Sequence, residues 1–282
     1  MIPRCFSFLR FLISLVKLTV VIACFLCYFL SAFFASLVFF FLKTPVKRLL
    51  VSRLIHIFNL CLVNIIGIRI KVTGAIGAVA AVGTGVFLVS NHLSYVDGFI
   101  LGSLFPVIYV SKSDLKNWPL IGLMSDFSGT LYIDRNRKNH IAEYIGVIAE
   151  TLSAGANVLF FPEGTSSNGD SLLPFKAAFF EAPLAAGAPI VPAAIIYSSV
   201  DGEPVGKNNR DRVYWHGDMT FADHFFRLLS CSRVDVEVRI SPAIILKDEG
   251  DRGPLRKRAC ESAYEAILKG IDEGKRQREE ER

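Results

Sequence analysis

Ser90-Asn91-His92-Leu93-Ser94-Tyr95-Val96-Asp97 is a polar stretch that joins two apolar segments. Residues 86–89 before it form an apolar run of strand length, and residues 98–105 after it have the composition of a short buried helix. The histidine therefore lies where a strand gives way to a helix. In α/β folds this junction is where functional side chains gather.

The spacing of His92 and Asp97 restricts how the two can meet. Residues five apart on one helix point about 140° away from each other, so these two can touch only across a turn. There the carboxylate would accept the proton of one ring nitrogen and leave the other nitrogen basic, which is a general base with its orienting partner. The alternative is a capping box formed by Ser94 and Asp97, which accounts for the aspartate without catalysis.

Composition and charge separate the N-terminal part from the rest of the chain. Hydrophobic residues make up 52% of the 282 residues, and phenylalanine occurs 23 times. Asp97 is the first acidic residue and nine Lys or Arg precede it, whereas the remainder carries 22 basic and 26 acidic residues. A basic, apolar N-terminal part favours anionic lipid headgroups over nucleic acid as its partner. Six scattered cysteines are expected to be reduced.

Residues 18–42 form a run of 25 residues without a charge. This length spans a hydrocarbon core with some tilt. A signal peptide would have a shorter apolar region that ends in small residues, whereas this run ends in Phe39-Phe40-Phe41-Leu42. Basic residues flank both ends, so the positive-inside rule does not choose an orientation and a shallow re-entrant hairpin stays open.

Residues 46–66 are apolar at helical spacing but include Arg53, His56, Asn59 and Asn64. This pattern predicts an amphipathic helix on the membrane surface rather than a second span. We therefore expect a membrane anchor over residues 1–67, a folded domain over residues 68–274, and a disordered charged tail over residues 275–282.

Strand and helix patterns alternate through the folded domain, which predicts an α/β fold with a mixed, mostly parallel sheet flanked by helices. The segment at 234–240 alternates as a strand with one wet face would. The expected strands are residues 68–72, 86–89, 107–110, 130–134, 158–161, 190–197 and 234–240, and the expected longer helices are residues 141–152, 177–186 and 255–271.

Four stretches line up with the four sequence blocks of one enzyme family. They are Asn91–Asp97, Gly129-Thr130-Leu131-Tyr132-Ile133-Asp134-Arg135, Phe161-Pro162-Glu163-Gly164-Thr165-Ser166 and Ile190-Val191-Pro192-Ala193-Ala194. In this order and at these intervals they resemble the phospholipid/glycerol acyltransferase family, whose best-known bacterial members are 1-acylglycerol-3-phosphate acyltransferases. The resemblance covers roughly residues 70 to 245.

The resemblance implies a role for each matching residue. His92 would deprotonate the acceptor hydroxyl, which attacks the thioester of acyl-CoA or acyl-carrier protein, and Asp97 would orient His92. Arg135 would bind phosphate, unless it is a surface residue of a basic cluster. Glu163, Gly164 and Thr165 match the acceptor-binding block, although an unrelated turn would use the same residues. Lys112 matches a less regular basic position between the first two blocks. The implied chemistry needs no metal or cofactor.

One departure bears on the acceptor. Many phosphate-accepting members have arginine directly after the threonine, whereas this chain has Ser166. We expect lysophosphatidic acid as the acceptor if Lys112 or Lys176 compensates. The alternative is lyso-ornithine lipid, because the segments at 165–180 and 214–220 look similar to the subgroup that acylates it. That acceptor has a hydroxyl and a zwitterionic head without phosphate.

Other enzyme classes find less support in the sequence. The chain has no Gly-x-Ser-x-Gly elbow, P-loop, complete dinucleotide fingerprint or His-Glu-x-x-His. A thioesterase and a non-catalytic membrane scaffold stay open. The spacing of His216, Asp218, Asp223 and His224 suits solvent-facing polar residues better than a metal site. We therefore expect an enzyme on the cytoplasmic face of a membrane, with a bacterial inner membrane as the favoured location.

Overall fold

The computed structural model describes residues 4–38, 41–42, 44–79, 85–118, 121–134, 138–246 and 252–280. Their centre is one sheet with the strand order β1-β8-β6-β2-β5-β3-β4, in which β7 pairs with β6. The strands are β1 (Ile68–Gly74), β2 (Phe87–Ser90), β3 (Val107–Lys112), β4 (Leu131–Ile133), β5 (Asn157–Phe160), β6 (Ile190–Val200), β7 (Glu203–Pro204) and β8 (Val234–Ile240).

The sheet is mixed and mostly parallel, which confirms the predicted fold class. β2 runs parallel to both β5 and β6, β3 runs parallel to β5 and β4, and β1 runs parallel to β8. β8 and the short β7 are antiparallel to β6. The carboxyl ends of β2 and β5 therefore lie side by side, which brings two of the sequence blocks to one edge of the sheet.

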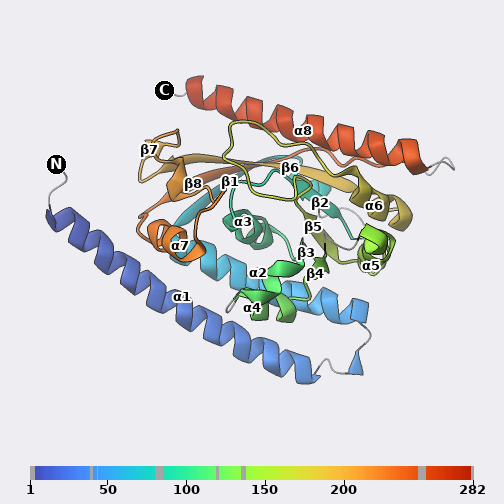
Figure 1. The fold of residues 1–282 in the computed structure, drawn as a ribbon, viewed down its shortest axis with the longest axis horizontal. Helices are drawn as coiled ribbons and strands as arrows, with labels where there is room; N and C mark the ends of the chain where they lie inside the picture. The colour runs from blue at the N-terminus through green and yellow to red at the C-terminus, as the bar shows by residue number, and fades with distance from the viewer. Residues whose placement is uncertain are drawn as a thin grey trace.

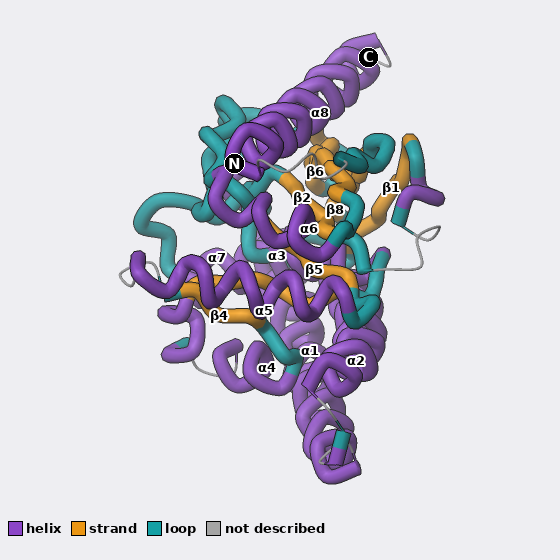
Figure 2. Tube along the Cα trace, turned by 90° about the vertical axis from the view of Figure 1, so that its right-hand side faces the viewer, coloured by secondary structure: helices purple, strands orange, loops and turns teal. Residues whose placement is uncertain are grey.

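Helices cover both faces of the sheet (Figure 1). In the view turned by 90°, the strands lie between α8 on one side and α1 and α2 on the other (Figure 2). The helices are α1 (Arg4–Val38), α2 (Thr44–Ile66), α3 (Val96–Leu104), α4 (Ile121–Phe127), α5 (Ile141–Ser153), α6 (Glu181–Ala186), α7 (Phe221–Leu229) and α8 (Arg252–Glu280). The structure also describes five short 3₁₀ turns, which are η2 (Ile76–Ala78), η3 (Ser113–Asn117), η4 (Lys138–His140), η5 (Ala177–Phe180) and η6 (Arg210–Arg212).

Two apolar cores form, one on each face of the sheet. Leu88 of β2 packs in the core with α1, α2, α3 and α7, whereas its neighbours Phe87 and Val89 pack in the core with α5, α6 and α8. All three side chains are fully buried. Burial on both faces explains why this strand is continuously apolar instead of alternating.

α1 exposes an apolar surface along most of its length. Its exposed residues include Val16, Leu26, Leu30 and Phe34, with 63%, 58%, 60% and 61% of their surface accessible. Residues 10–38 and 46–66 are both long and apolar enough to cross a membrane. The helix begins well before residue 18, where the charge-free run starts, and ends at Val38. These helices fit a membrane-associated protein.

α2 packs an apolar face against the protein, with Ile55, Phe58 and Leu62 buried, and two polar residues also contact the protein. The Nδ1 atom of His56 lies 2.8 Å from the carbonyl oxygen of Gly102, and the Asn59 amide donates to the Tyr109 hydroxyl at 2.5 Å. Ile57 and Leu60 are exposed, at 58% and 39%. Of the four polar residues that the sequence singled out, Arg53 and Asn64 are exposed, whereas His56 and Asn59 have partners in α3 and β3.

The chain end differs from the prediction. The last helix continues through residues 275–280, which we expected to be disordered, and residues 281–282 lie outside the described part. Two contacts hold this end against the sheet. Arg278 donates to the carbonyl oxygen of Tyr197 at 2.9 Å, and Arg239 lies 3.4 Å from Glu273. Packing on the sheet therefore orders a segment whose composition alone favours solvent.

The crossing of α2 and α3 leads to a stability prediction. A Cβ atom at Gly102 would lie 2.1 Å from the Tyr109 hydroxyl and 2.2 Å from the Asn59 amide nitrogen, whereas a Cβ at Gly146 in α5 would meet nothing within 4 Å. We expect Gly102→Ala to destabilise the protein by about 1–3 kcal/mol through overpacking. Gly146→Ala is the matched control and should stabilise it by about 0.5–1 kcal/mol. Thermal unfolding in detergent micelles measures both, and an unchanged midpoint in Gly102→Ala would contradict the close packing.

Candidate active site

The His92 loop leaves the sheet at the carboxyl end of β2. Asn91 fixes its first turn, because the Asn91 amide donates to the Ile195 carbonyl oxygen at 3.0 Å and accepts from the Ile195 backbone nitrogen at 2.8 Å. The buried side chain of Asn91 thus continues the pairing of β2 with β6 by one residue beyond the strand. This connection sets the position of the next residue, His92.

The structure brings His92 and Asp97 together, as their spacing predicts. The His92 Nδ1 atom lies 3.0 Å from Asp97 Oδ2. The same oxygen accepts from the backbone nitrogens of Leu93 at 2.6 Å and Ser94 at 2.8 Å. The other oxygen, Oδ1, accepts from the Tyr197 hydroxyl at 2.7 Å, and Asp97 is fully buried. Four donors therefore hold one carboxylate in place.

The capping alternative accounts for only part of this arrangement. α3 begins at Val96, and its N-cap residue Tyr95 makes no side-chain cap bond. The contact from the Ser94 nitrogen to Asp97 resembles one half of a capping box. The same carboxylate also holds the histidine, so the aspartate organises both the helix start and the imidazole.

Tyr197 was not expected to belong to the site. Burial and the neighbouring Asp97 raise the pKa of Tyr197 well above its ordinary value, so the phenol keeps its proton and can donate. The sequence signals only a buried strand at this position. Its contact with Asp97 spans 100 residues and depends on β6 lying beside β2.

The imidazole of His92 presents its second nitrogen to a cavity. The ring stacks on Phe161, with centroids 4.1 Å apart and planes 17° apart, and the side chain is 20% exposed. The Ser167 backbone nitrogen donates to the His92 carbonyl oxygen at 2.9 Å. Since Nδ1 faces Asp97, Nε2 is the nitrogen available to a substrate.

The cavity beside His92 has a volume of 270 Å³ and is lined mainly by apolar and aromatic side chains. Three of the predicted substrate-binding residues line it, namely Lys112, Gly164 and Thr165. Ser166 and Lys176 line it as well. Arg135, the predicted phosphate ligand, lies outside the described residues.

Gly164 occupies a position that requires glycine. Its φ angle is +72°, and a Cβ atom there would lie 2.3 Å from the Lys176 Nζ atom. The missing side chain therefore lets the Lys176 ammonium pass close to the backbone beside the cavity. Lys176 itself is tied to this block, because its backbone nitrogen donates to Pro162 O at 3.0 Å.

Glu163 lies behind the His92 loop rather than in the cavity wall. Its Oε1 accepts from the His92 backbone nitrogen at 2.6 Å, and its Oε2 accepts from the Leu173 backbone nitrogen at 3.0 Å. Burial raises the pKa of Glu163 to about 7, although these hydrogen bonds act in the opposite direction. This placement favours a positioning role over the acceptor contact that the sequence predicts.

The segment around Trp215 also reaches the site. The Trp215 backbone nitrogen donates to the Leu93 carbonyl oxygen at 2.9 Å, and the Trp215 side chain lines the cavity. The Tyr214 ring lies against Tyr197, with centroids 5.4 Å apart. The sequence singled out residues 214–220 by resemblance, but gave no sign that they close over the His92 loop.

Three of the four polar residues that the sequence weighed as metal ligands have other partners. His224 is buried, and its Nδ1 lies 2.9 Å from the Tyr95 hydroxyl. His216 lies 3.4 Å from Asp211, and Asp223 accepts from Thr220. Within the described ranges, no three His, Cys, Asp or Glu side chains gather in a way that could hold a metal ion.

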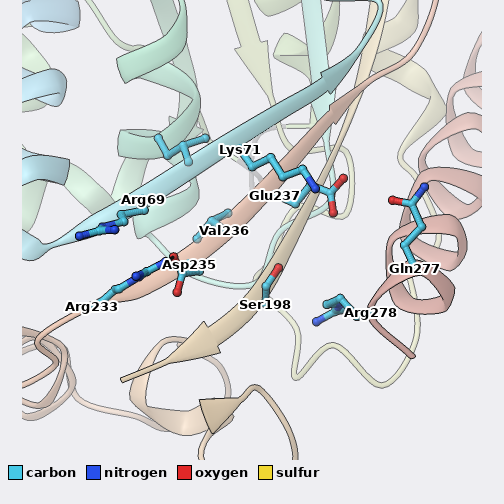
Figure 3. Close-up of a pocket in the computed structure, with 10 residues that line it drawn as sticks. Arg69, Lys71, Ser198, Arg233, Asp235, Val236, Glu237, Gln277 and Arg278 are labelled. Carbon is cyan, nitrogen blue, oxygen red and sulfur yellow. Dashed lines mark hydrogen bonds and ion pairs between the residues drawn. The ribbon is translucent and has the colours of Figure 1, made fainter. Parts of the chain in front are cut away.

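A second pocket, of 360 Å³, lies over β1, β6, β8 and the end of α8 (Figure 3). Charged side chains of both signs line it, and Arg233 pairs with Asp235 at 2.7 Å. None of the predicted site residues belongs to it. The cavity beside His92 is therefore the candidate active site, because it joins His92 to three of the predicted substrate-binding residues, Lys112, Gly164 and Thr165.

Fold and site together define a class of protein. A histidine held by a buried carboxylate, at the carboxyl ends of parallel strands and facing an apolar cavity, is the arrangement of an α/β enzyme that uses a general base. The exposed apolar helices beside this cavity suit an enzyme of amphipathic substrates.

Comparison with known proteins gives the family. Residues 69–196 match the model of the family described as Acyltransferase. A lyso-ornithine lipid O-acyltransferase of Brucella abortus is 31% identical over 264 residues, covering 91% of this chain and 96% of the relative. A 1-acyl-sn-glycerol-3-phosphate acyltransferase of Neisseria gonorrhoeae is 30% identical over 188 residues, covering 67% of this chain and 71% of the relative. The chain belongs to this acyltransferase family.

A solved structure shares the fold. The crystal structure of the 1-acyl-sn-glycerophosphate acyltransferase PlsC from Thermotoga maritima matches with a TM-score of 0.66 at 18% identity, covering 96% of this chain and 98% of that chain. The match includes the two N-terminal helices as well as the sheet, since so little of either chain lies outside it.

The raised pKa of Glu163 predicts a pH-dependent stability. Because its pKa is about 7 in the folded protein and 4.5 ordinarily, folding favours the protonated form. The contribution of Glu163 to the free energy of unfolding is fully present below pH 4.5 and falls by up to roughly 3 kcal/mol as the pH rises towards 7. Glu163→Gln cannot titrate, so its free energy of unfolding should lose this dependence on pH. Denaturant unfolding between pH 5 and 8 measures it.

The exposed Glu203→Gln removes the same charge from the surface and is the matched control. It should keep the pH slope of the native protein. Equal slopes in native protein and Glu163→Gln would show that Glu163 is not the titrating group.

Proposed function

We propose that this protein transfers a fatty acyl group from acyl-CoA or acyl-carrier protein to the hydroxyl of lyso-ornithine lipid. The observation that carries the choice of acceptor is the residue that follows Thr165. Ser166 lines the cavity beside His92, at the position where many phosphate-accepting members of the family have arginine. A phosphomonoester is bound best by the bidentate fork of arginine.

The proposed reaction uses the histidine twice. His92 Nε2 takes the proton of the acceptor hydroxyl as its oxygen attacks the carbonyl carbon of the thioester. The carbon–sulfur bond then breaks, and the thiolate leaves with the proton that His92 carries. Asp97 stabilises the imidazolium formed between the two steps. No metal, cofactor or covalent acyl-enzyme is required.

The relatives support the same acceptor. The Brucella abortus lyso-ornithine lipid O-acyltransferase aligns over 91% of this chain and 96% of its own length, which takes in the region of Trp215. A Pseudomonas aeruginosa relative with the same name is 34% identical over 182 residues. The segment that closes over the His92 loop therefore lies within the shared region.

Lysophosphatidic acid is the second candidate acceptor. Lys112 and Lys176 line the cavity, and two ammonium groups could pair with one phosphate. The Neisseria gonorrhoeae relative, named for that activity, supports this reading at 30% identity. The choice of acceptor depends on whether these two lysines take the place of the arginine that is absent at position 166.

We place the reaction at the cytoplasmic face of the membrane. The exposed apolar surface of α1 would enter the lipid, and the basic residues of the N-terminal part would meet anionic headgroups. The anchor would hold the cavity where lysolipid and product partition.

The acceptor is tested by thiol release from acyl-CoA in detergent micelles. We expect turnover with lyso-ornithine lipid, little with lysophosphatidic acid, and none without acceptor. Ser166→Arg should raise the kcat/KM for lysophosphatidic acid by roughly 10- to 100-fold, since a charge-assisted pair is worth about 1.5–3 kcal/mol. Ser166→Gln has similar length without the charge and is the control. Efficient use of lysophosphatidic acid by the native protein would contradict the proposed acceptor, and thiol release without acceptor would indicate a thioesterase.

The catalytic pair is tested by single substitutions. His92→Ala should abolish detectable transfer while membrane attachment stays intact, because a general base contributes about 10²–10⁴ in rate. Asp97→Asn should also lower kcat strongly, since the amide cannot hold the imidazole in the required tautomer. Tyr197→Phe removes only one of the four donors to Asp97 and should have a smaller effect. Native-like turnover in His92→Ala would remove the histidine from the mechanism.

A further inference from the structure

Three aromatic side chains, Tyr95, Trp118 and Trp215, line one side of the cavity that holds His92. We refer to them as the aromatic wall. The two indole rings stand nearly perpendicular, at 84° with centroids 5.5 Å apart. The Tyr95 ring meets Trp215 at 68° and 5.8 Å. The wall thus presents ring faces in different planes around one space.

Two of the three rings of the wall have their polar groups bound by the protein itself. The Trp215 indole nitrogen donates to the Met219 carbonyl oxygen at 3.0 Å, and the Tyr95 hydroxyl lies 2.9 Å from His224 Nδ1. Burial lowers the pKa of His224 to about 4, so this histidine is neutral at physiological pH. Tyr95 and Trp215 can therefore offer a ligand chiefly their ring faces.

Contacts with α7 and with the His92 loop hold the aromatic wall in place. Phe221 of α7 packs on Tyr95 with centroids 4.9 Å apart and on Trp118 with centroids 5.6 Å apart. The backbone of Trp215 is fixed to the His92 loop through Leu93. The rings are therefore preorganised beside the catalytic histidine and need little reordering to bind a ligand.

The charges around the cavity determine what the wall can recognise. No Asp or Glu is among the described residues that line it, whereas Lys112 and Lys176 are. An anionic group of a substrate has these ammonium groups as partners. A cationic group has no carboxylate here, and the aromatic faces are the remaining attractive surface.

We propose that the aromatic wall binds the ammonium group of a zwitterionic acceptor headgroup by cation–π contact, while Lys112 binds its carboxylate. This inference rests on the proposed function and adds to it how the protein recognises the acceptor headgroup. Lys112 and Trp118 flank the same short helix, η3 (Ser113–Asn117), so both contacts lie on one side of the cavity. An ornithine headgroup has both charges and no phosphate.

The chain contains two tryptophans, and both belong to the wall. Intrinsic tryptophan fluorescence therefore reports on it directly. We would titrate the full chain in micelles of an uncharged detergent, without donor, with lyso-ornithine lipid and with the same lipid acetylated on its side-chain amine. We expect the acetylated lipid to bind about 3- to 30-fold more weakly, which is the range of cation–π strengths.

Variants separate the charge of the ligand from its apolar contacts. Trp215→Leu should abolish the difference between the two lipids, and Trp215→Phe should keep most of it. Phe226→Leu is the matched control, because Phe226 packs on Phe11 of α1 and not on the wall. In turnover assays, Trp215→Leu should raise the KM for lyso-ornithine lipid and leave the KM for acyl-CoA unchanged.

Three outcomes would overturn the inference. The native protein could bind both lipids equally, Trp215→Leu could weaken both equally, or it could raise the KM for acyl-CoA instead, which would assign the wall to the donor. Because the titration involves no turnover, it stands apart from the proposed function. Binding that discriminates the ammonium, without transfer to lyso-ornithine lipid, would support the wall and contradict the proposed reaction.

Discussion

The buried carboxylate of Asp97 is the constraint on which the site depends. It accepts from the His92 ring, from two backbone nitrogens of the same loop, and from Tyr197 on a neighbouring strand. A buried carboxylate is costly unless its oxygens are satisfied, so these donors must be in place whenever the chain is folded. The geometry of the histidine is thereby coupled to the packing of the sheet.

A second buried carboxylate supports the same loop from behind. Glu163 joins the His92 backbone to the Leu173 backbone, and the His92 ring stacks on Phe161 two residues before it. The block after β5 therefore positions His92 with its side chains and borders the cavity with Gly164 and Thr165. One short turn serves both tasks because β5 and β2 are adjacent and parallel.

Much of the fold and part of the site could be predicted from the sequence. Apolar runs and alternation are local signals, and they indicated the strands, the first helix and the His92–Asp97 contact. The helical structure of residues 275–280 was not predicted, because it depends on contacts such as that of Arg278 with Tyr197, which is 81 residues away. The contacts of His56 and Asn59 in α2 were missed for a similar reason, because their polar partners lie on other elements.

The sequence by itself determined the pairing of His92 with Asp97, the apolar character of the N-terminal part and the acyltransferase pattern. These are carried by residue types at short spacing, where backbone geometry leaves few arrangements. Only the tertiary structure decided that Glu163 holds the loop, that Tyr197 completes the environment of Asp97, and that Trp118 and Trp215 share a cavity with His92. Such contacts join residues about 25 to 125 positions apart, and they depend on strand order and helix packing, which no local pattern encodes.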